Sequence, residues 1–297
     1  MNVQGADCSV VVRTVHREMN IAYAEETLRD AYSLLIEEAA IEGAGNCKAV
    51  RKAAGVTGCV VTPLSINATP LLLYLAFGSA GKPVSVAKAG GVYRCSLDLV
   101  PQQDSGRFDL IQDRGGQRRF FSGCRVKGFE LRVMREEDIK LKLDICGENP
   151  ASIFEYAEKE NRPESERQVG ERFNGNNVGY KINGIEYQNI YGVTLVSRKQ
   201  GGTRTELWIK RAKQKETATG GFELPDCIEK MSITAQLVRQ RYGQTCFGTF
   251  RITLENLVMV SDETNVNSAD AVIGPLRYYV SGAVSADVFS CGNEVLQ

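Results

Sequence analysis

The strict alternation of apolar and charged residues in residues 139–145 (IKLKLDI) is the feature that most restricts how this chain can fold. Successive side chains of a β-strand point to opposite faces of a sheet, so this alternation predicts a strand with one buried and one wet face. Residues 92–99 and 124–133 alternate in a similar way, and residues 134–138 (MREED) read as a turn. The pattern predicts a mainly β protein.

The second half of the chain also contains many candidate strands. A turn at residues 199–202 (KQGG) separates two of its candidate strands. Residues 276–289 are expected to form one long strand or a broken pair of strands. The other candidate strands are residues 187–196, 205–210, 232–238, 248–254 and 257–260.

One short motif occurs twice. Val126-Lys-Gly-Phe-Glu-Leu131 and Ile190-Tyr-Gly-Val-Thr-Leu195 share the pattern [VI]-x-G-[FV]-x-L, and a second alternating strand follows each copy after a turn. The match is open to three interpretations, which are chance, two similar hairpins or an old duplication.

Two segments have helical features. Residues 20–42 place Ile21, Leu28 and Leu35 at helical spacing, which predicts a one-sided helix that ends at Gly43. This helix could dock on the core or act as an N-terminal arm that packs on a neighbouring subunit. Residues 149–162 open with Asn-Pro, a favoured helix start, and predict a second helix.

Residues 101–116 (PQQDSGRFDLIQDRGG) are polar and rich in glycine, and they read as a long hairpin loop. Three apolar residues, Phe108, Leu110 and Ile111, interrupt the polar stretch. Long loops in compact domains often carry contacts to partners. We therefore expect this loop to insert its apolar side chains into a neighbouring subunit.

Composition excludes several classes of protein. The 36 basic residues balance the 36 acidic ones, which argues against a general polyanion binder that works through bulk charge. The best apolar run, residues 70–77, is far shorter than the roughly 18 residues of a spanning helix, and the N-terminus does not read as a secretory signal. The nine scattered cysteines lack a CxxC pair and are expected to be free thiols in a reducing compartment, with a disulfide framework or zinc site as the alternative.

The sequence offers little for catalysis. His16 is the only histidine, so no histidine-based nucleophile, base or metal site is expected. Residues 262–270 hold several oxygen ligands but do not fit a known cation loop, and a solvated loop is the better interpretation. Carboxylates such as Glu136 and Asp138 would suit a hydrolase only in separated environments. We expect no catalytic, cofactor-binding or metal-binding residues.

The residues that carry a family resemblance lie mainly between 60 and 148. Residues 68–78 (ATPLLLYLAFG) and 91–99 (GVYRCSLDL), followed by the loop and the strand of residues 121–131, resemble tail tube proteins of tailed bacteriophages and related prophage particles. The resemblance implies a β-sandwich or barrel with a flanking helix. In this interpretation residues 1–57 form an N-terminal helical arm. Residues 58–297 form the β domain, with strand sets at 58–148 and 171–297 around a flanking helix at 149–162.

The resemblance also implies a function without enzymatic activity. Such subunits form hexameric rings that stack into a tube, through which DNA or an effector passes without specific binding. The implied partners are copies of the same chain, a tail terminator, a tape measure protein and a sheath, without any membrane. The implied location is the virion tail, assembled in the bacterial cytoplasm. The residues expected at the contact between subunits or rings are Phe108, Asp109, Leu110, Ile111, Asp113 and Arg114.

Two alternatives stay open. A duplicated subunit with two barrels would form trimeric rings, which the repeated motif would support. From a different functional class, a carbohydrate- or ligand-binding β-sandwich module would present an aromatic patch around Tyr187, Tyr191 and Trp208.

Overall fold

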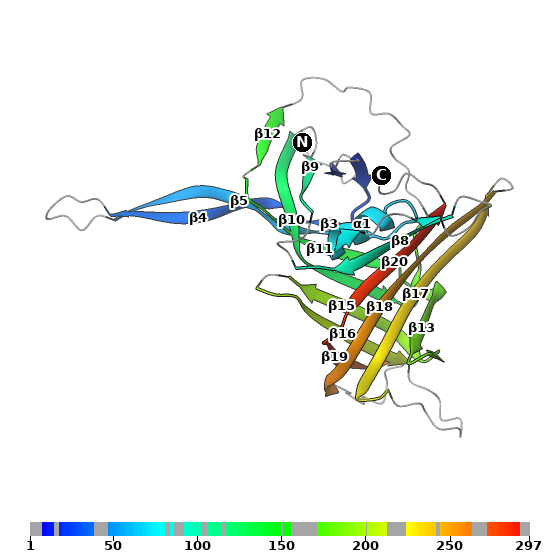
Figure 1. The fold of residues 1–297 in the computed structure, drawn as a ribbon. Coiled ribbons are helices and arrows are strands. Elements are labelled where there is room, and N and C mark those ends of the chain that lie inside the picture. The colour runs from blue at the N-terminus through cyan, green and yellow to red at the C-terminus, as the bar shows by residue number, and fades with distance from the viewer. Residues whose placement is uncertain are drawn as a thin grey trace.

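The protein is described by a computed structural model. The structure describes residues 8–14, 18–38, 47–80, 84–85, 92–101, 106–114, 117–149, 151–155, 171–199, 201–212, 224–241, 244–262 and 272–291. Antiparallel strands dominate this part of the chain and are joined into one hydrogen-bonded network (Figure 1). The chain is therefore mainly β, as the alternating sequence predicts.

The elements have the following bounds. The first half contains β1 (Cys8–Arg13), β2 (Glu18–Ile21), β3 (Glu25–Glu26), β4 (Arg29–Glu38), β5 (Cys47–Pro63), α1 (Thr69–Phe77), β6 (Gly78–Ala80), β7 (Val84–Ser85), β8 (Val92–Leu99), β9 (Phe108–Arg114), β10 (Gln117–Met134), β11 (Lys140–Gly147) and β12 (Ser152–Glu155). The second half contains the 3-10 helix η4 (Gly175–Asn177), β13 (Val178–Ile182), β14 (Ile185–Tyr187), β15 (Ile190–Arg198), β16 (Arg204–Ala212), β17 (Cys227–Arg241), β18 (Gln244–Asp262), β19 (Val272–Val280) and β20 (Val284–Cys291).

Strand β10 is the hub of the network. Its C-terminal half lies between β11 and β15, and its N-terminal half lies between β9 and β12. On one side the sheet continues from β11 to β5 and β4, and on the other from β15 through β16 and β19 to β18. The long strand β18 also pairs with β17 and β20, and β20 pairs with β8.

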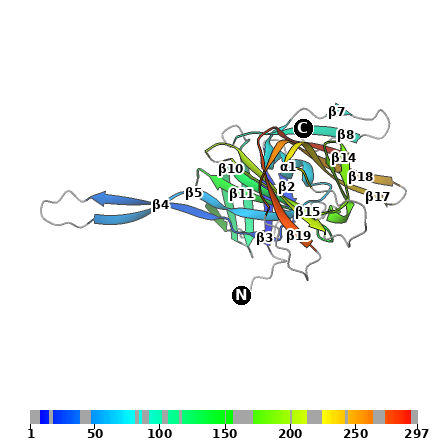
Figure 2. The same cartoon turned by 90° about the horizontal axis from the view of Figure 1, so that it is seen from below.

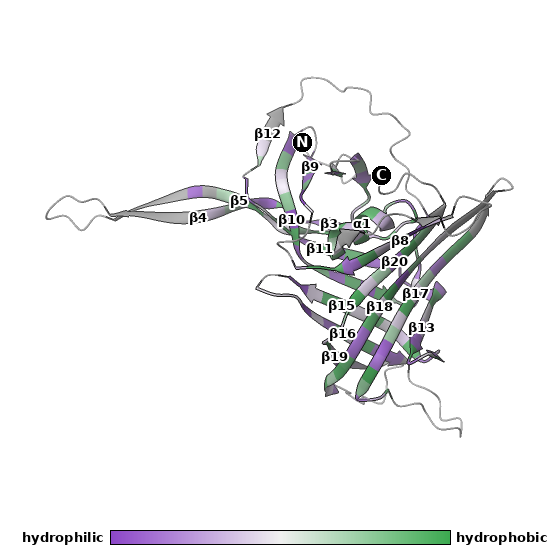
Figure 3. Cartoon of the chain, in the orientation of Figure 1, coloured by the Kyte–Doolittle hydropathy of each residue, from purple (hydrophilic) through white to green (hydrophobic). Residues whose placement is uncertain are grey.

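The alternating run becomes β11, as predicted. The side chains of Ile139, Leu141, Leu143 and Ile145 are buried, whereas Lys140, Lys142 and Asp144 are half-buried on the other face. Hydrophobic and hydrophilic residues also follow one another in bands along β17 and β18 (Figure 3). Residues 276–289 form a broken pair, because β19 ends at Val280 and β20 begins at Val284.

The two copies of the repeated motif lie in strands that pair with each other. In the antiparallel β10–β15 pair, Leu131 lies opposite Leu195, and the copies therefore meet about a local two-fold axis perpendicular to the sheet. Both copies carry a bulge at the same motif position, because the register shifts between Val126 and Gly128 in one hairpin and between Ile190 and Gly192 in the other. The two copies therefore lie in two similar hairpins that share an irregularity.

Helix α1 is the single α-helix of the described residues, and the sequence pattern did not reveal it. Its sequence (TPLLLYLAF) is apolar on every side, so it has no one-sided stripe to detect. Eight of its nine residues are buried, and the Phe77 ring stacks on Phe129 of β10 with centroids 5.5 Å apart. Within the described residues, no helix combines the length and the apolarity needed to cross a membrane.

The predicted N-terminal helix is wrong for the part of it that the structure describes. Residues 18–38 form β2, β3 and β4 instead of a helix, and β4 pairs along its length with β5. The seven-residue spacing of Ile21 and Leu28 arises because these two buried side chains belong to separate extended segments. Pairing with a distant strand outweighs the weak local preference for a helix. Residues 39–42 of the predicted helix lie outside the described residues.

Two further local predictions differ from the structure. Residues 152–155 of the predicted flanking helix form β12, which pairs with the N-terminal end of β10, while residues 156–162 lie outside the described part. The predicted hairpin loop at 101–116 contains β9, which lies between β1 and β10. In both cases a hydrogen-bonding partner elsewhere in the chain decides the conformation.

Candidate assembly surfaces

The first candidate surface is a projecting two-stranded ribbon, here called the arm hairpin, made of residues 31–38 of β4 and 47–55 of β5. Residues 56–63 of β5 pair with β11, but residues 47–55 pair only with β4. Figures 1 and 2 show the arm hairpin extending far from the rest of the protein. At roughly 3.3 Å per residue, its eight or nine residues reach on the order of 25 Å.

The arm hairpin leaves the sheet at Gly55. The backbone of Gly55 has φ +144°, and a Cβ at this position would collide with the carbonyl oxygen of Gly147 in β11. The β4–β5 register shifts next to this point, between Ala31 and Tyr32. Only glycine combines this φ with such a close approach, so Gly55 fixes where the arm departs.

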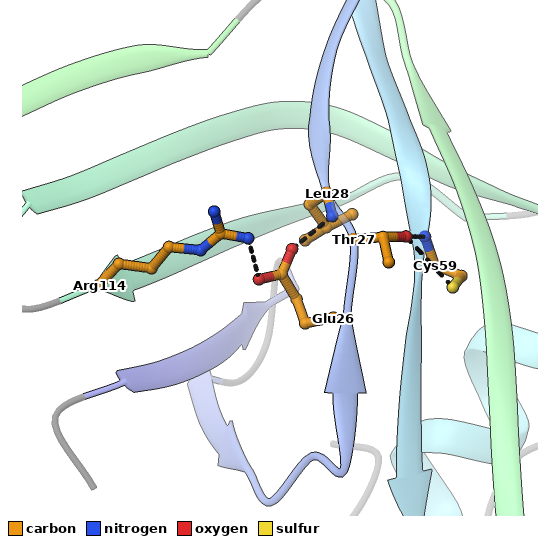
Figure 4. A network of polar contacts seen from close by, with 5 residues as sticks. All are labelled: Glu26, Thr27, Leu28, Cys59 and Arg114. Atoms are coloured by element: carbon orange, nitrogen blue, oxygen red, sulfur yellow. Dashed lines mark hydrogen bonds and ion pairs between the residues drawn. The ribbon is translucent and has the colours of Figure 1, made fainter. Parts of the chain in front are cut away.

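A polar network holds the base of the arm hairpin (Figure 4). The Glu26 carboxylate, whose side chain is only 3% exposed, accepts hydrogen bonds from the backbone N–H of Leu28 and from Arg114 Nη2, the latter at 2.7 Å. The Thr27 hydroxyl accepts a hydrogen bond of 3.0 Å from the backbone N–H of Cys59 in β5. The segment before β4 is therefore tied to both β9 and β5.

The second candidate surface is the outer edge of β17 at residues 236–241, here called the β17 edge. Strand β13 covers residues 231–235 of β17, and β18 pairs along the opposite side of the whole strand. Within the described ranges, no backbone partner lies on the outer side of residues 236–241. Val238 in this segment is 63% exposed.

The third candidate surface is the aromatic patch, formed by Trp208 of β16, Tyr279 of β19, and Val258 and Val260 of β18. These side chains are 37–58% exposed. Trp208 lies opposite Arg277 in the β16–β19 pair, and Arg277 Cζ stands 5.7 Å from the centroid of the Trp208 ring. Arg277 also donates two hydrogen bonds to Glu206 Oε2, at 2.7 and 3.0 Å, which fixes the guanidinium over the indole.

The residues expected at an intersubunit contact lie together in β9, but in a different role. The side chains of Phe108 and Leu110 are only 3% and 1% exposed and pack in the subunit's own core, and Ile111 is half-buried. They cannot insert into a neighbouring subunit without leaving that core. The expectation that these apolar side chains project from an exposed loop into a neighbouring subunit is therefore wrong.

The polar members of the same set also have partners within the chain. Asp109 accepts a hydrogen bond of 2.9 Å from the backbone N–H of Gly123, at the bulge between β9 and β10. Asp113 is buried and receives one of 3.2 Å from Arg118, while Arg114 binds Glu26. These contacts place β9 firmly in the sheet.

Two of the three aromatic residues predicted for a carbohydrate site, Tyr187 and Trp208, lie in different environments, and Tyr191 is half-buried in β15. Tyr187 packs against the core, and its partner across the strand pair is the buried Tyr180. Trp208 instead lies on the exposed face with the aromatic patch. The structure thus keeps Trp208 as a candidate contact residue but gives it different neighbours from those predicted.

The candidate chemical residues are placed as follows. Asp138 forms an ion pair of 3.1 Å with Arg172, and the backbone N–H of Glu136 donates to the Asn176 side chain. His16 and residues 263–270 lie outside the described residues. In the described part of the chain, His, Cys, Asp and Glu side chains form no cluster that could hold a metal ion.

The sequence did not reveal one buried charge. Lys199 is 2% exposed, and its Nζ donates a hydrogen bond of 3.1 Å to the carbonyl oxygen of Phe77 at the C-terminal end of α1. Burial lowers the pKa of Lys199 from 10.5 to about 8. The sequence places this lysine in a polar turn (KQGG), which gives no signal for burial.

Five described cysteines are free thiols: Cys59, Cys95, Cys124, Cys146 and Cys227. Burial raises the pKa of Cys95 to about 11 and that of Cys124 to about 12, with smaller contributions from Asp287 and Asp109 respectively. A raised thiol pKa disfavours the reactive thiolate. These two cysteines act as small core residues.

No protein-family model matches the chain, and no curated protein matches it. The functional argument therefore depends on the surfaces described above.

Proposed function

We propose that this chain is a structural subunit of a phage-like tail, which assembles into stacked hexameric rings that form the tail tube. The observation that carries the proposal is the arm hairpin, a ribbon whose two strands find backbone partners only in each other in the described structure. The family resemblance of residues 60–148 supplies the identity of the assembly. In this function DNA or an effector passes through the tube, in a virion tail with terminator, tape measure and sheath proteins as neighbours.

The physical argument starts from the stability of the arm hairpin. An isolated two-stranded ribbon is at best marginally stable in water, and an open strand edge readily pairs with another chain. A chain that keeps such a ribbon gains most when a partner covers it. Contacts between two different surfaces of identical copies close into rings or continue as filaments, and stacked rings give a tube.

The charge of the chain is compatible with a passive conduit. Equal numbers of basic and acidic residues give no general attraction to DNA. Acidic side chains such as Asp98 lie exposed on the strand faces, and Asp144 is half-buried. A lumen lined in this way would let DNA slide without holding it.

The repeated motif does not favour the alternative of a duplicated subunit in trimeric rings. Neighbouring units of a ring are related by rotation about the tube axis. Under this rotation, equivalent strands of all units have the same direction relative to the axis. The two motif copies instead run antiparallel about a local two-fold axis between Leu131 and Leu195. That symmetry closes on itself and does not propagate around a ring.

A second candidate function is a ligand-binding module, and the aromatic patch favours it. Exposed Trp208 and Tyr279 offer flat apolar surfaces of the kind that stack on sugar rings, and Arg277 and Glu206 add polar groups beside them. Glycan binding that is lost in the Trp208→Ala variant would support this function. The same variant should leave assembly into rings intact if the tail function is correct.

The direct test is the oligomeric state of the full chain. Sedimentation velocity and negative-stain microscopy of the purified protein should show rings or tubes whose abundance rises with protein concentration. A protein that stays monomeric at every accessible concentration would contradict the proposal. The Trp208→Ala variant serves as the control that separates assembly from ligand binding.

A further inference from the structure

The outer β4 edge of the arm hairpin and the β17 edge lie at opposite ends of the molecule. Figures 1 and 2, which are related by a rotation about the horizontal axis, both show the arm hairpin on the left and the distal ends of β17 and β18 on the right. The two edges therefore cannot pair within one chain. They can pair only between copies, which is the head-to-tail arrangement that builds rings or filaments.

The two edges carry opposite charge. Residues 33–38 of β4 (SLLIEE) contain two acidic and no basic residues, for a formal charge of 0 − 2 = −2. Residues 236–241 of β17 (QLVRQR) contain two basic and no acidic residues, for a formal charge of 2 − 0 = +2. Complementary charge favours the contact between unlike edges over a contact between two β17 edges.

We propose that the β4 edge of the arm hairpin in one copy adds as a strand to the β17 edge of the next copy. This inference depends on the proposed self-assembly and identifies the two surfaces that would carry it. The joined sheet would run β5–β4–β17–β18 across the subunit boundary. Each β4–β17 contact would supply backbone partners to both open edges at once.

The positions of the charges favour a parallel alignment of the two strands. Glu37 and Glu38 stand at the C-terminal end of β4, and Arg239 and Arg241 stand toward the C-terminal end of β17. A parallel alignment brings these ends together. In an antiparallel alignment of the same two segments, Glu38 and Arg241 would stand about five residues, or roughly 16 Å, apart, which exceeds the screening length of about 8 Å at physiological salt. Glu37 and Arg239 would stand about two residues, or roughly 7 Å, apart, so the parallel alignment gains mainly from the Glu38–Arg241 pair.

The same alignment matches the apolar positions. When residue 38 stands beside residue 241, Leu34 stands beside Leu237 and Leu35 beside Val238. Val238 is 63% exposed and Leu237 is half-buried in the subunit. Neighbouring aliphatic residues across a strand pair add stability to the pairing. A parallel register shifted by one residue places Glu37 beside Arg239, Ile36 beside Val238 and Leu35 beside Leu237. Two adjacent parallel registers therefore satisfy both charge and hydropathy.

The test is a charge exchange between the two edges. The Glu37→Arg/Glu38→Arg variant and the Arg239→Glu/Arg241→Glu variant should each raise the protein concentration needed for assembly by about tenfold or more, because like charges then meet at every contact. An equal mixture of the two variants should assemble, with the variants alternating. The fourfold variant, which exchanges both charges and keeps the net charge at zero, should assemble alone.

Matched controls carry the same changes in net charge at exposed sites away from both edges. These controls are Lys181→Glu/Lys210→Glu and Glu186→Arg/Glu229→Arg, whose native side chains are all exposed. Both should assemble like the wild type. Circular dichroism and the melting temperature of each variant check that it folds, and sedimentation velocity measures its assembly.

The possible failures are distinguishable. If the wild type assembles and either edge variant assembles equally well alone, the edge pairing is wrong but the proposed function stands. Assembly of the Arg239→Glu/Arg241→Glu variant with loss only in the Glu37→Arg/Glu38→Arg variant would indicate arm-to-arm pairing and would also overturn the inference. A wild type that never assembles overturns the proposed function as well.

Discussion

Leu131 and Leu195 lie directly opposite each other in the β10–β15 pair, and each is the last residue of its copy of the repeated motif. Both side chains are essentially fully buried. Each motif also pairs through its own hairpin with a further buried leucine, Leu141 of β11 or Leu207 of β16. The centre of the sheet therefore contains two equivalent copies of the same arrangement, in which the last leucine of the motif pairs with a buried leucine of the neighbouring hairpin strand.

This local symmetry predicts equal costs for equivalent truncations. Leu131→Ala and Leu195→Ala should each lower the free energy of unfolding by about 2 to 5 kcal/mol, because each removes buried methyl groups and leaves a cavity. Chemical denaturation monitored by circular dichroism measures the loss. The half-buried neighbour Glu130→Ala, on the opposite face, should cost much less, and a large difference between the two leucines would argue against equivalent environments.

The motif glycines make a second prediction. A Cβ on Gly192 would lie 2.6 Å from the carbonyl oxygen of Val133 and would also collide with the Sδ atom of Met134. A Cβ on Gly128 would lie 2.8 Å from the carbonyl oxygen of Ser197. Backbone oxygens cannot move aside cheaply, so Gly192→Ala and Gly128→Ala should each cost about 1 to 3 kcal/mol. Gly179→Ala in β13 is the matched control.

Gly179 also lies in a strand, but a Cβ there would meet nothing within 4 Å. Its substitution should be neutral or slightly stabilising in thermal unfolding, because alanine restricts the unfolded chain. If all three alanine variants have the same melting temperature, close approach of the backbone does not explain why the motif contains glycine.

Strands with one wet face were predictable from the sequence, because burial on one side imposes alternation, as in β11. Helix α1 was not predictable from the sequence, because a helix buried on all sides has no periodicity that distinguishes it from a buried strand. The arm hairpin and β9 were misassigned for another reason. Their strand partners, β5 for β4 and β1 for β9, are set by contacts between segments that local sequence does not encode.

The candidate surfaces were harder to predict than the strands. Residues Phe108, Leu110 and Ile111 were chosen because they interrupt a polar stretch, but Phe108 and Leu110 are buried and Ile111 is half-buried within the subunit. The two open edges could not be identified before the pairings were known, because an edge is defined by the neighbour it lacks.

The Glu26–Arg114 ion pair gives a third prediction, about the base of the arm hairpin. Its distance of 2.7 Å equals that of the Arg13–Glu18 pair, but the Glu26 side chain is 3% exposed and that of Glu18 is 45% exposed. A double-mutant cycle with alanine at Glu26 and Arg114 should give a coupling free energy of about 1 to 3 kcal/mol.

The same cycle at Arg13 and Glu18 should give about 0.2 to 1 kcal/mol, because solvent screens an exposed pair. Urea unfolding of the four variants in each cycle supplies the values. Equal couplings in the two cycles would mean that burial of Glu26 does not strengthen its contact with Arg114.

Lys199 gives a prediction about pH. Its pKa is about 8 in the folded protein and 10.5 in the unfolded chain. Between these values the unfolded chain binds more protons, so the contribution of Lys199 to stability rises with pH. Below pH 8 both states are protonated, and the folded protein carries the full cost of burying the charge.

The Lys199→Met variant removes this cost. At pH 7 it should be at least as stable as the wild type, since the carbonyl oxygen of Phe77 keeps a hydrogen bond from the backbone N–H of Val100. From pH 8 to 9.5 the wild type should gain about 1 to 2 kcal/mol relative to the variant. Because Cys95 and Cys124 titrate in both proteins, their opposite effect cancels in the difference. A difference in unfolding free energy that stays constant over this range would show that burial of Lys199 does not lower its pKa.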